Sequence, residues 1–112
     1  MRIVEYKKCC KIIDEVMLFF LTRGMKDITI DYKCENNIDT LYFVVKNVTE
    51  KSYKSFKEKL TVHHEMQYEG FGWELMGDCD YDELGLVGAL IDELETHIDG
   101  NDLKIKMVRR FE

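Results

Sequence analysis

Proline is absent from the sequence, and no internal repeat, low-complexity tract or linker interrupts it. Nothing therefore divides the chain, and its 112 residues provide room for one hydrophobic core but not for two. A chain of this size buries roughly two-thirds of its unfolded surface, which stabilises a fold without metal ions or disulfides. We expect residues 1–112 to form a single domain.

Long hydrophobic segments are absent too. The most apolar run covers residues 12–21, and Asp14 and Glu15 interrupt it. A membrane span needs about 20 apolar residues, and the apolar part of a signal peptide contains no acids. The sequence therefore predicts a soluble protein of the cytoplasm that has no membrane partner.

The four cysteines form no motif. Cys9, Cys10, Cys34 and Cys79 contain no CxxC pair and no spacing typical of a tetrahedral zinc site. In a cytoplasmic protein such thiols are expected to be reduced and mostly buried. Cys9 and Cys10 are neighbours in a predicted helix and point in different directions, so we expect no bond between them.

Basic residues are missing from a long stretch of the chain. Residues 60–103 contain twelve Asp and Glu residues and no Lys or Arg, and the whole chain has a formal charge of −6. Such a stretch repels phosphate groups, which argues against nucleic acid or an anionic membrane as the main partner. It predicts an acidic face, which is either a solvated helix surface or a site for a protein partner.

Hydrophobic periodicity in the first half predicts a helix followed by two strands. The helix is expected at residues 4–23, and Gly24 supplies the left-handed residue that commonly ends a helix. Alternation predicts a half-buried strand at 28–33 and a central strand at 41–45, joined by a turn at Asn36 and Asn37. The apolar face of the helix is formed by residues three or four apart: Tyr6, Cys10, Ile13, Met17, Phe20 and Leu21.

The second half predicts two further helices and a strand. Thr49 is the expected N-cap of a helix that begins near residue 50, and residues 63–75 are interpreted as a broken helix. Asp80 and Glu83 have capping-box spacing and begin a helix at 81–97, which Gly100 closes. The last strand is expected at 103–108. The buried stripes of the two helices are Tyr53, Phe56 and Leu60 in the first, and Leu84, Val87, Ile91, Leu94 and Ile98 in the second.

The predicted order of elements is α-β-β-α-α-β. This order is typical of an α+β sandwich in which helices pack on one face of a small, mostly antiparallel sheet. Three strands are few for a sheet. We therefore expect either a fourth strand within residues 61–77 or dimerisation through a sheet edge.

A run of acids offers the best candidates for a metal site. Asp78, Asp80 and Asp82 occupy the first, third and fifth positions of a calcium loop. The pattern then fails, because Glu83 stands where the loop needs glycine and Ala89 where it needs a bidentate glutamate. The same acids are also favoured at the start of a helix by its dipole. Helix capping and a divalent-metal site are the two interpretations.

No catalytic set is recognisable. His63 and His64 are adjacent, so a helix or strand aims them in different directions, and no nucleophile with an orienting partner accompanies them. The glycine-rich stretch GFGW at residues 70–73 lacks the pattern of a phosphate-binding loop. We expect neither catalytic residues nor a cofactor.

Candidate interaction residues lie in the acidic segment. Trp73 is either a core aromatic residue or an anchor for a partner. The helix predicted at 81–97 has heptad-like spacing, which suits docking or self-association, so a homodimer is one expected form. The candidate interaction surface comprises Trp73, Glu74, Asp78, Asp82 and Glu83.

Two stretches carry a resemblance to a known group of proteins. They are FFLTRGMKDITIDY at residues 19–32 and EMQYEGFGWELMGDCDYDELGLVGALIDELETHIDGNDLKIKMVRR at residues 65–110. Together they cover about half of the chain, and they resemble small bacterial proteins described as sensor-histidine-kinase related. The resemblance implies a role in bacterial signal transduction.

The chain departs from true histidine kinases at their catalytic boxes. His64 and Glu65 begin like a phosphoacceptor box, but Gln67 and Tyr68 follow and the closing proline is missing. Neither the asparagine-bearing helix nor the DxGxG loop of an ATP-binding half is present. The resemblance therefore implies an accessory or sensory module without kinase chemistry.

Three functional hypotheses follow from the sequence. The first is a non-catalytic regulatory or interaction module of a bacterial signalling system, which binds a protein partner or itself. The second is a divalent-metal or small-ligand domain, or an enzyme, built on Asp78, Asp80 and Asp82. The third is a purely structural dimer.

Overall fold

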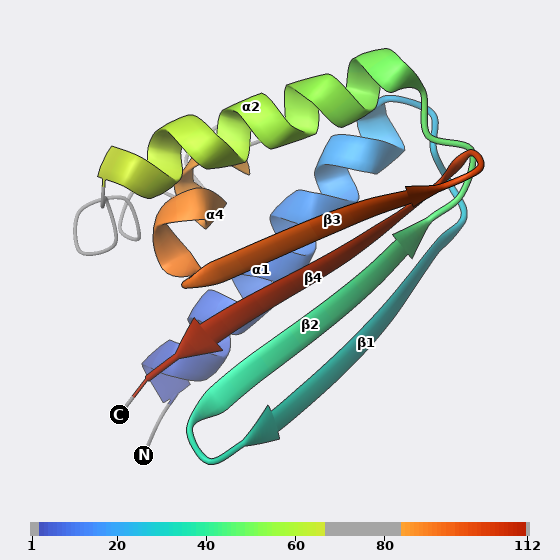
Figure 1. Cartoon of the computed structure of the whole chain (residues 1–112). Helices are drawn as coiled ribbons and strands as arrows, with labels where there is room; N and C mark the ends of the chain where they lie inside the picture. The colour runs from blue at the N-terminus through green and yellow to red at the C-terminus, as the bar shows by residue number, and fades with distance from the viewer. Residues whose placement is uncertain (1–2, 67–83, 112) are drawn as a thin grey trace.

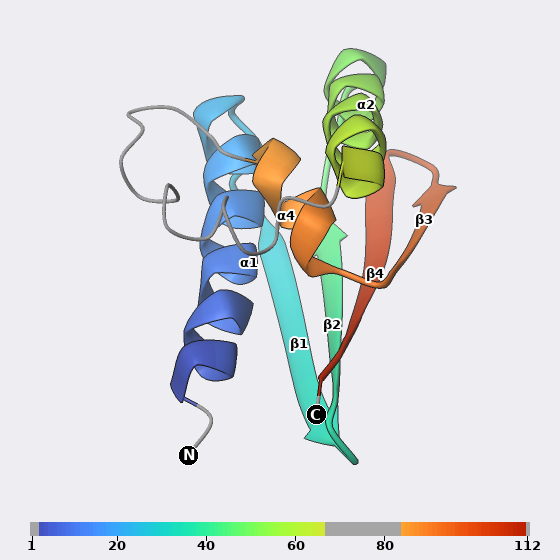
Figure 2. The same ribbon diagram turned by 90° about the vertical axis from the view of Figure 1, so that its left-hand side faces the viewer.

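The computed structural model describes residues 3–66 and 84–111, without the side chains of residues 61–66. Within them, three helices cover one face of a four-stranded antiparallel sheet (Figures 1 and 2). This is the predicted α+β architecture. The helices are α1 (Ile3–Thr22), α2 (Glu50–Met66) and α4 (Leu84–Leu90), and the strands are β1 (Ile28–Glu35), β2 (Ile38–Val45), β3 (Glu93–Asp99) and β4 (Asp102–Arg110).

The sheet consists of two hairpins lying side by side, in the strand order β1-β2-β4-β3. The first hairpin turns at Asn36 and Asn37, whose φ angles of 52° and 62° lie in the left-handed region that asparagine tolerates. The second turns at Gly100, whose φ is 67°. Antiparallel pairing of β2 with β4 joins the two hairpins and makes these strands the centre of the sheet.

The hydrophobic core lies between the sheet and the helices. Phe43 of β2 is paired with Ile105 of β4, and both are buried under the helical layer. On the helical side, three aromatic rings of Phe19, Phe20 and Phe56 contact one another at centroid distances of 5.0–5.6 Å. Because Phe56 belongs to α2, this aromatic cluster fixes α2 against α1.

The sequence predictions for residues 3–60 are confirmed in their main elements. The helix α1 ends two residues before Gly24, whose φ of 90° favours glycine. The hydroxyl Oγ1 of Thr49 accepts a hydrogen bond from the backbone N–H of Ser52 at 3.1 Å, the N-cap geometry expected for α2. The strand predicted to be central, β2, is an inner strand of the sheet.

The face on which α1 is buried differs from the prediction. The structure buries Ile12, Val16 and Phe19, whereas Tyr6 and Leu21 of the predicted face are exposed. Residues 12–21 are apolar on most of the helix surface, so more than one stripe satisfies helical periodicity. Packing against the sheet and against Phe56 determines which of these stripes is buried.

The prediction of one helix over residues 81–97 is wrong for residues 93–97. The helix α4 ends at Leu90, and residues 93–99 form the strand β3 instead. Leu94 and Ile98 are four residues apart, a spacing that suits one face of a helix and one face of a strand alike. In the sheet they face Met107 and Leu103 of β4. Gly100 consequently closes a hairpin rather than a helix.

The described residues supply a fourth strand, β3, which lies within the helix predicted at 81–97. The expectation of a strand within residues 61–77 is tested only in part. Residues 61–66 belong to α2, and residues 67–77 lie outside the described part of the chain. The sheet has two edges, formed by β1 and β3. Most residues of β1 are exposed, as expected for an edge strand.

Candidate functional site

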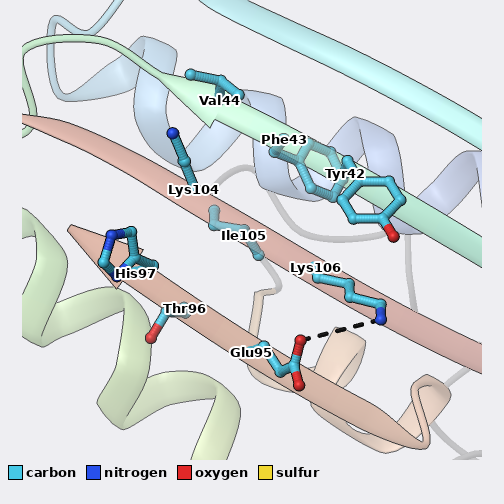
Figure 3. Close-up of a pocket in the computed structure, with 9 residues that line it drawn as sticks. All are labelled: Tyr42, Phe43, Val44, Glu95, Thr96, His97, Lys104, Ile105 and Lys106. Atoms are coloured by element: carbon cyan, nitrogen blue, oxygen red, sulfur yellow. Dashed lines mark ion pairs between the residues drawn. The ribbon is translucent and has the colours of Figure 1, made fainter. Parts of the chain in front are cut away.

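The face of the sheet opposite the helices carries a hollow of about 590 Å³ (Figure 3). We call this side of the sheet the open face. The hollow lies over β2, β4 and β3, the three strands that supply its lining. The side chains that project onto the open face there are Tyr42, Val44, Glu95, His97, Lys104 and Lys106.

Strand register explains how these side chains come together. Lys106 of β4 is paired with Tyr42 on one side and with Glu95 on the other, which makes one row across three strands. The next row on the same face is Val44, Lys104 and His97. Since side chains of a strand alternate between the two faces, residues 42 and 44 share the open face while Phe43 enters the core. The hollow is thus a direct product of antiparallel pairing.

The hollow combines an aromatic ring with charges of both signs. The Nζ of Lys106 lies 5.9 Å from the ring centroid of Tyr42 and 4.0 Å from a carboxylate oxygen of Glu95. The Nζ of Lys104 lies 3.5 Å from Asp99 at the end of β3. Tyr42 is 46% exposed. The site therefore offers a ring for stacking, two ammonium groups, a carboxylate and an imidazole for hydrogen bonds.

This arrangement is suited to binding. The Thr96 hydroxyl beside the hollow lies 3.2 Å from the phenolic oxygen of Tyr53, so it is engaged on the helical side of the sheet. Among residues 3–60 and 84–111, no three His, Cys, Asp or Glu side chains are grouped so that they could hold a metal ion. The hollow is an amphipathic surface of the sheet, on which apolar and charged side chains lie next to one another.

A second constellation of polar residues surrounds a buried carboxylate at the end of the sheet near α1. Asp39 is 1% exposed, and its Oδ1 accepts a hydrogen bond of 2.8 Å from the hydroxyl of Tyr32. Its other oxygen, Oδ2, has no hydrogen-bond partner among the residues that the structure describes. Burial, and next the hydrogen bond to Asp39, raise the pKa of Tyr32. Burial and the nearby charge of Asp39 also raise the pKa of the Cys9 thiol, to about 12.

Arg109 ties the same region together. Its guanidinium donates to Oε2 of Glu5 in α1, at 2.7 and 3.2 Å, and to the backbone carbonyl of Leu90 at the end of α4. Burial opposes ionisation of Glu5, but the hydrogen bonds and charges of Arg109 and Lys8 together outweigh it and lower the pKa of Glu5. These contacts join α1, α4 and β4, which is a structural role.

No disulfide joins the cysteines of the described residues, and these cysteines are less buried than predicted. Cys9 is buried, whereas Cys10 and Cys34 are exposed. No bond joins Cys9 to Cys10, as expected for neighbours on a helix. Cys79 lies outside the described residues.

The site residues proposed from the sequence lie outside the part of the chain that the structure describes. The interaction candidates Trp73, Glu74, Asp78, Asp82 and Glu83, and the metal candidate Asp80, all belong to residues 67–83. His63 and His64 lie in α2, but their side chains are not described. These assignments stay predictions.

Sequence reasoning missed the hollow on the open face. Glu95 and His97 were assigned to a helix, so nothing placed them beside Lys104 and Lys106. The signal was present in the segment 93–99, where Glu93, Glu95 and His97 alternate with apolar or β-branched residues at the period of a strand.

Comparison with known proteins adds no relative. No family model, curated protein or solved structure matches this chain. Of the helices in the described residues, none is long and apolar enough to cross a bilayer. The function has to be inferred from the geometry of the chain itself.

Proposed function

We propose that this chain is a non-catalytic protein-interaction module that binds its partner through the open face of the sheet. One observation carries the proposal. All described helices cover the opposite face, while the open face presents Tyr42 and Val44 beside a hollow lined by charges of both signs. Tyrosine is among the residues that most often contribute strongly to binding at protein interfaces.

The chemistry of the hollow favours a protein partner over an anionic polymer. Lys104 and Lys106 are each close to a carboxylate, at 3.5 and 4.0 Å, so the local charge is mixed. Nucleic acid and anionic membranes require an uncompensated basic surface. Tyr42 supplies the apolar contact area, and the flanking charges give orientation and specificity.

The biological setting that we propose is bacterial signal transduction in the cytoplasm. The support is the resemblance of residues 19–32 and 65–110 to proteins described as sensor-histidine-kinase related. The module would act there as an accessory or sensory part, since the kinase boxes are missing from its sequence. Its partner would be another protein of the signalling system.

Site-specific photo-crosslinking tests the open face directly. A benzophenone amino acid replaces Tyr42 in one version and the exposed Lys54 of α2 in a control, both expressed in the native cell. We expect a defined adduct with a signalling protein from position 42 and none from position 54. Equal adduct yields from both positions would show that the open face is not the binding surface.

A binding measurement with the partner so identified provides the quantitative test. Tyr42→Ala should raise the dissociation constant at least tenfold, which corresponds to about 1.4 kcal/mol, because it removes the central aromatic contact. Lys54→Ala on α2 is the matched control and should leave the constant unchanged. An unchanged constant for Tyr42→Ala contradicts the proposal.

A further inference from the structure

The outer side of α1 exposes apolar side chains that the core does not use. Ile3, Tyr6 and Leu21 are 48%, 52% and 39% exposed, and Leu18 is 37% exposed. The helix lies at one side of the helical layer, so its outer side faces away from the sheet (Figure 2). Residues along this side are spaced alternately by four and three positions, the spacing of a coiled-coil seam: Ile3, Lys7, Cys10, Asp14, Met17 and Leu21.

A hollow runs along the N-terminal half of this seam. Its volume is about 520 Å³, and the residues that line it are Ile3, Tyr6, Lys7, Cys10, Lys11 and Asp14. They form two consecutive sets of four, 3-6-7-10 and 7-10-11-14. Each set has the geometry of a hole that receives one side chain from a second helix. The outer side of α1 is therefore shaped for helix packing.

We infer that a second copy of this chain occupies the seam, with the two α1 helices antiparallel. A two-fold axis near residue 12 then makes the interface self-complementary. Ile3 lies opposite Leu21 of the second copy, Lys7 opposite Met17, and Cys10 opposite Asp14. The apolar hole at 3-6-7-10 receives Met17 or Leu18 from the C-terminal half of the other helix.

Charge complementarity selects the antiparallel orientation. The Asp14 side chain is 63% exposed, and the Nζ of Lys11 in its own helix is 3.6 Å away. In the antiparallel pair Asp14 lies between Lys7 and Lys11 of the second copy. A parallel pair would place Lys7 against Lys7 and Asp14 against Asp14, and like charges across a seam destabilise it.

The expected dimer is a weak one and leaves the open face free. The helix α1 has 20 residues, so the seam is about 30 Å long and one helix wide. Such a contact is smaller than a standard stable interface, and we expect a dissociation constant in the micromolar range. Since the seam and the open face are on different sides, the dimer goes beyond the proposed function, and either assignment can fail without the other.

Charge variants test the interface by sedimentation equilibrium of the purified chain alone. Three charged residues line the hollow, Lys7, Lys11 and Asp14. Lys7→Glu with Lys11→Glu makes all three acidic, and Asp14→Lys makes all three basic. We expect each variant alone to dimerise at least tenfold more weakly than the wild type, and an equimolar mixture to recover dimerisation. Tyr42→Ala on the open face is the matched control and should dimerise like the wild type.

Cysteine cross-linking tests the orientation. Two chains are prepared, one with Lys7→Cys and one with Met17→Cys, each in a background of Cys10→Ser, Cys34→Ser and Cys79→Ser. In the antiparallel register residue 7 of one copy faces residue 17 of the other, while two residues 7 are about 15 Å apart along the axis. A disulfide needs Cα atoms within about 7 Å. Oxidation should therefore link the mixture and leave each chain alone unlinked.

The outcomes separate the alternatives. A wild-type chain that stays monomeric at several hundred micromolar overturns the proposal, as does a mixture of charge variants that remains monomeric. Efficient linking of the Lys7→Cys chain with itself would mean a parallel pair and would equally overturn it. Far-UV circular dichroism and melting curves verify that each variant is folded. This check matters most for Lys11→Glu, because the Lys11 side chain is 27% exposed and its Nζ lies 3.9 Å from the buried Glu15.

Discussion

The buried Arg109 and the half-buried Glu5 connect elements that are far apart in the chain. The guanidinium of Arg109 is almost completely buried, and it is satisfied by the Glu5 carboxylate and by the carbonyl of Leu90. A buried charge that loses its partner pays the full cost of desolvation. The stability of this corner of the molecule therefore depends on single side chains, and it depends on pH.

The substitution Glu5→Gln is expected to lower the free energy of unfolding at pH 7 by about 1–2 kcal/mol, because it leaves Arg109 without its counter-charge. The pKa of Glu5 is lower in the folded chain than in the unfolded chain. The ion pair consequently stabilises the fold above about pH 4.3 and loses its effect as the pH falls through the folded-state pKa. Urea titrations of wild type and variant should converge toward pH 3.

Glu58→Gln is the control for this prediction, because Glu58 is an exposed residue of α2. Its substitution should change the free energy of unfolding by less than about 0.5 kcal/mol at any pH. A difference between wild type and Glu5→Gln that stays constant from pH 7 to pH 3 would contradict the assigned ion pair.

The thiols of Cys9 and Cys10 are expected to react very differently with iodoacetamide. Burial raises the pKa of Cys9 to about 12, so at pH 8 its thiol is protonated and shielded, whereas Cys10 is exposed. A Cys10→Ser chain should retain an unmodified Cys9 for hours in the native state and lose it on addition of denaturant. Mass spectrometry of the peptide that contains residue 9 measures this. Rapid native modification of Cys9 would contradict the buried position.

Among the elements, α2 shows most directly how local chemistry fixes a boundary. Thr49 lies just before the helix and caps it through Oγ1, which accepts the N–H of Ser52 and also lies 2.9 Å from the Ser52 hydroxyl. The backbone N–H of Tyr53 then donates to the carbonyl of Thr49. The bond from Ser52 satisfies an N–H group that the first turn of a helix otherwise leaves without a partner, and the bond from Tyr53 is the first regular bond of the helix.

Thr49→Ala is expected to lower the free energy of unfolding by about 1 kcal/mol, since the methyl group cannot accept the hydrogen bond. Thr49→Ser keeps the hydroxyl and should stay within a few tenths of a kcal/mol of the wild type. Thermal or urea denaturation measures both. If serine destabilised as much as alanine, the loss would come from the threonine methyl group and not from the cap.

The whole molecule combines an unevenly charged chain with a two-layer fold. On the open face, β4 contributes Lys104 and Lys106, and the acids of β3 lie beside them. The negative charge of the acids in β3 is thus partly neutralised by the lysines of β4. The order of residues in the sequence does not show that these two strands are neighbours. This pairing leaves the open face mixed in charge rather than acidic.

Divalent cations are expected to leave the melting temperature of the whole chain within about 2 °C of its chelator-treated value. The reason is that Asp78, Asp80 and Asp82 lack the later ligands of a calcium loop. A ligand at 100 times its dissociation constant would stabilise by about 2.7 kcal/mol, which moves the midpoint by roughly 10 °C in a chain of this size. A thermal-shift panel with calcium, magnesium, manganese and zinc measures this.

Asp80→Asn combined with Asp82→Asn is the matched control of that panel. A shift of the expected size in the wild type that disappears in this variant would replace the interaction module by a metal-binding domain. A shift that persists in the variant would place the ion elsewhere in the chain.

The elements that the sequence predicted correctly are those with local causes. Gly24 ends α1, Asn36 and Asn37 make the first turn, and Thr49 begins α2, because each depends on the dihedral angles or hydrogen bonds of a few adjacent residues. The alternation in β2 likewise indicated a strand. An α+β fold with helices on one face followed from the order of these elements.

The other features of the fold and the candidate site were decided only by tertiary contacts. Leu94 and Ile98 are compatible with a helix and with a strand, and pairing with Met107 and Leu103 of β4 made residues 93–99 a strand. The same packing chose which face of α1 is buried and so left Tyr6 and Leu21 exposed. The hollow on the open face depends on that register across three strands. Contacts between residues distant in sequence outweighed local periodicity at each of these places, because burial against a partner contributes more free energy than intrinsic propensity.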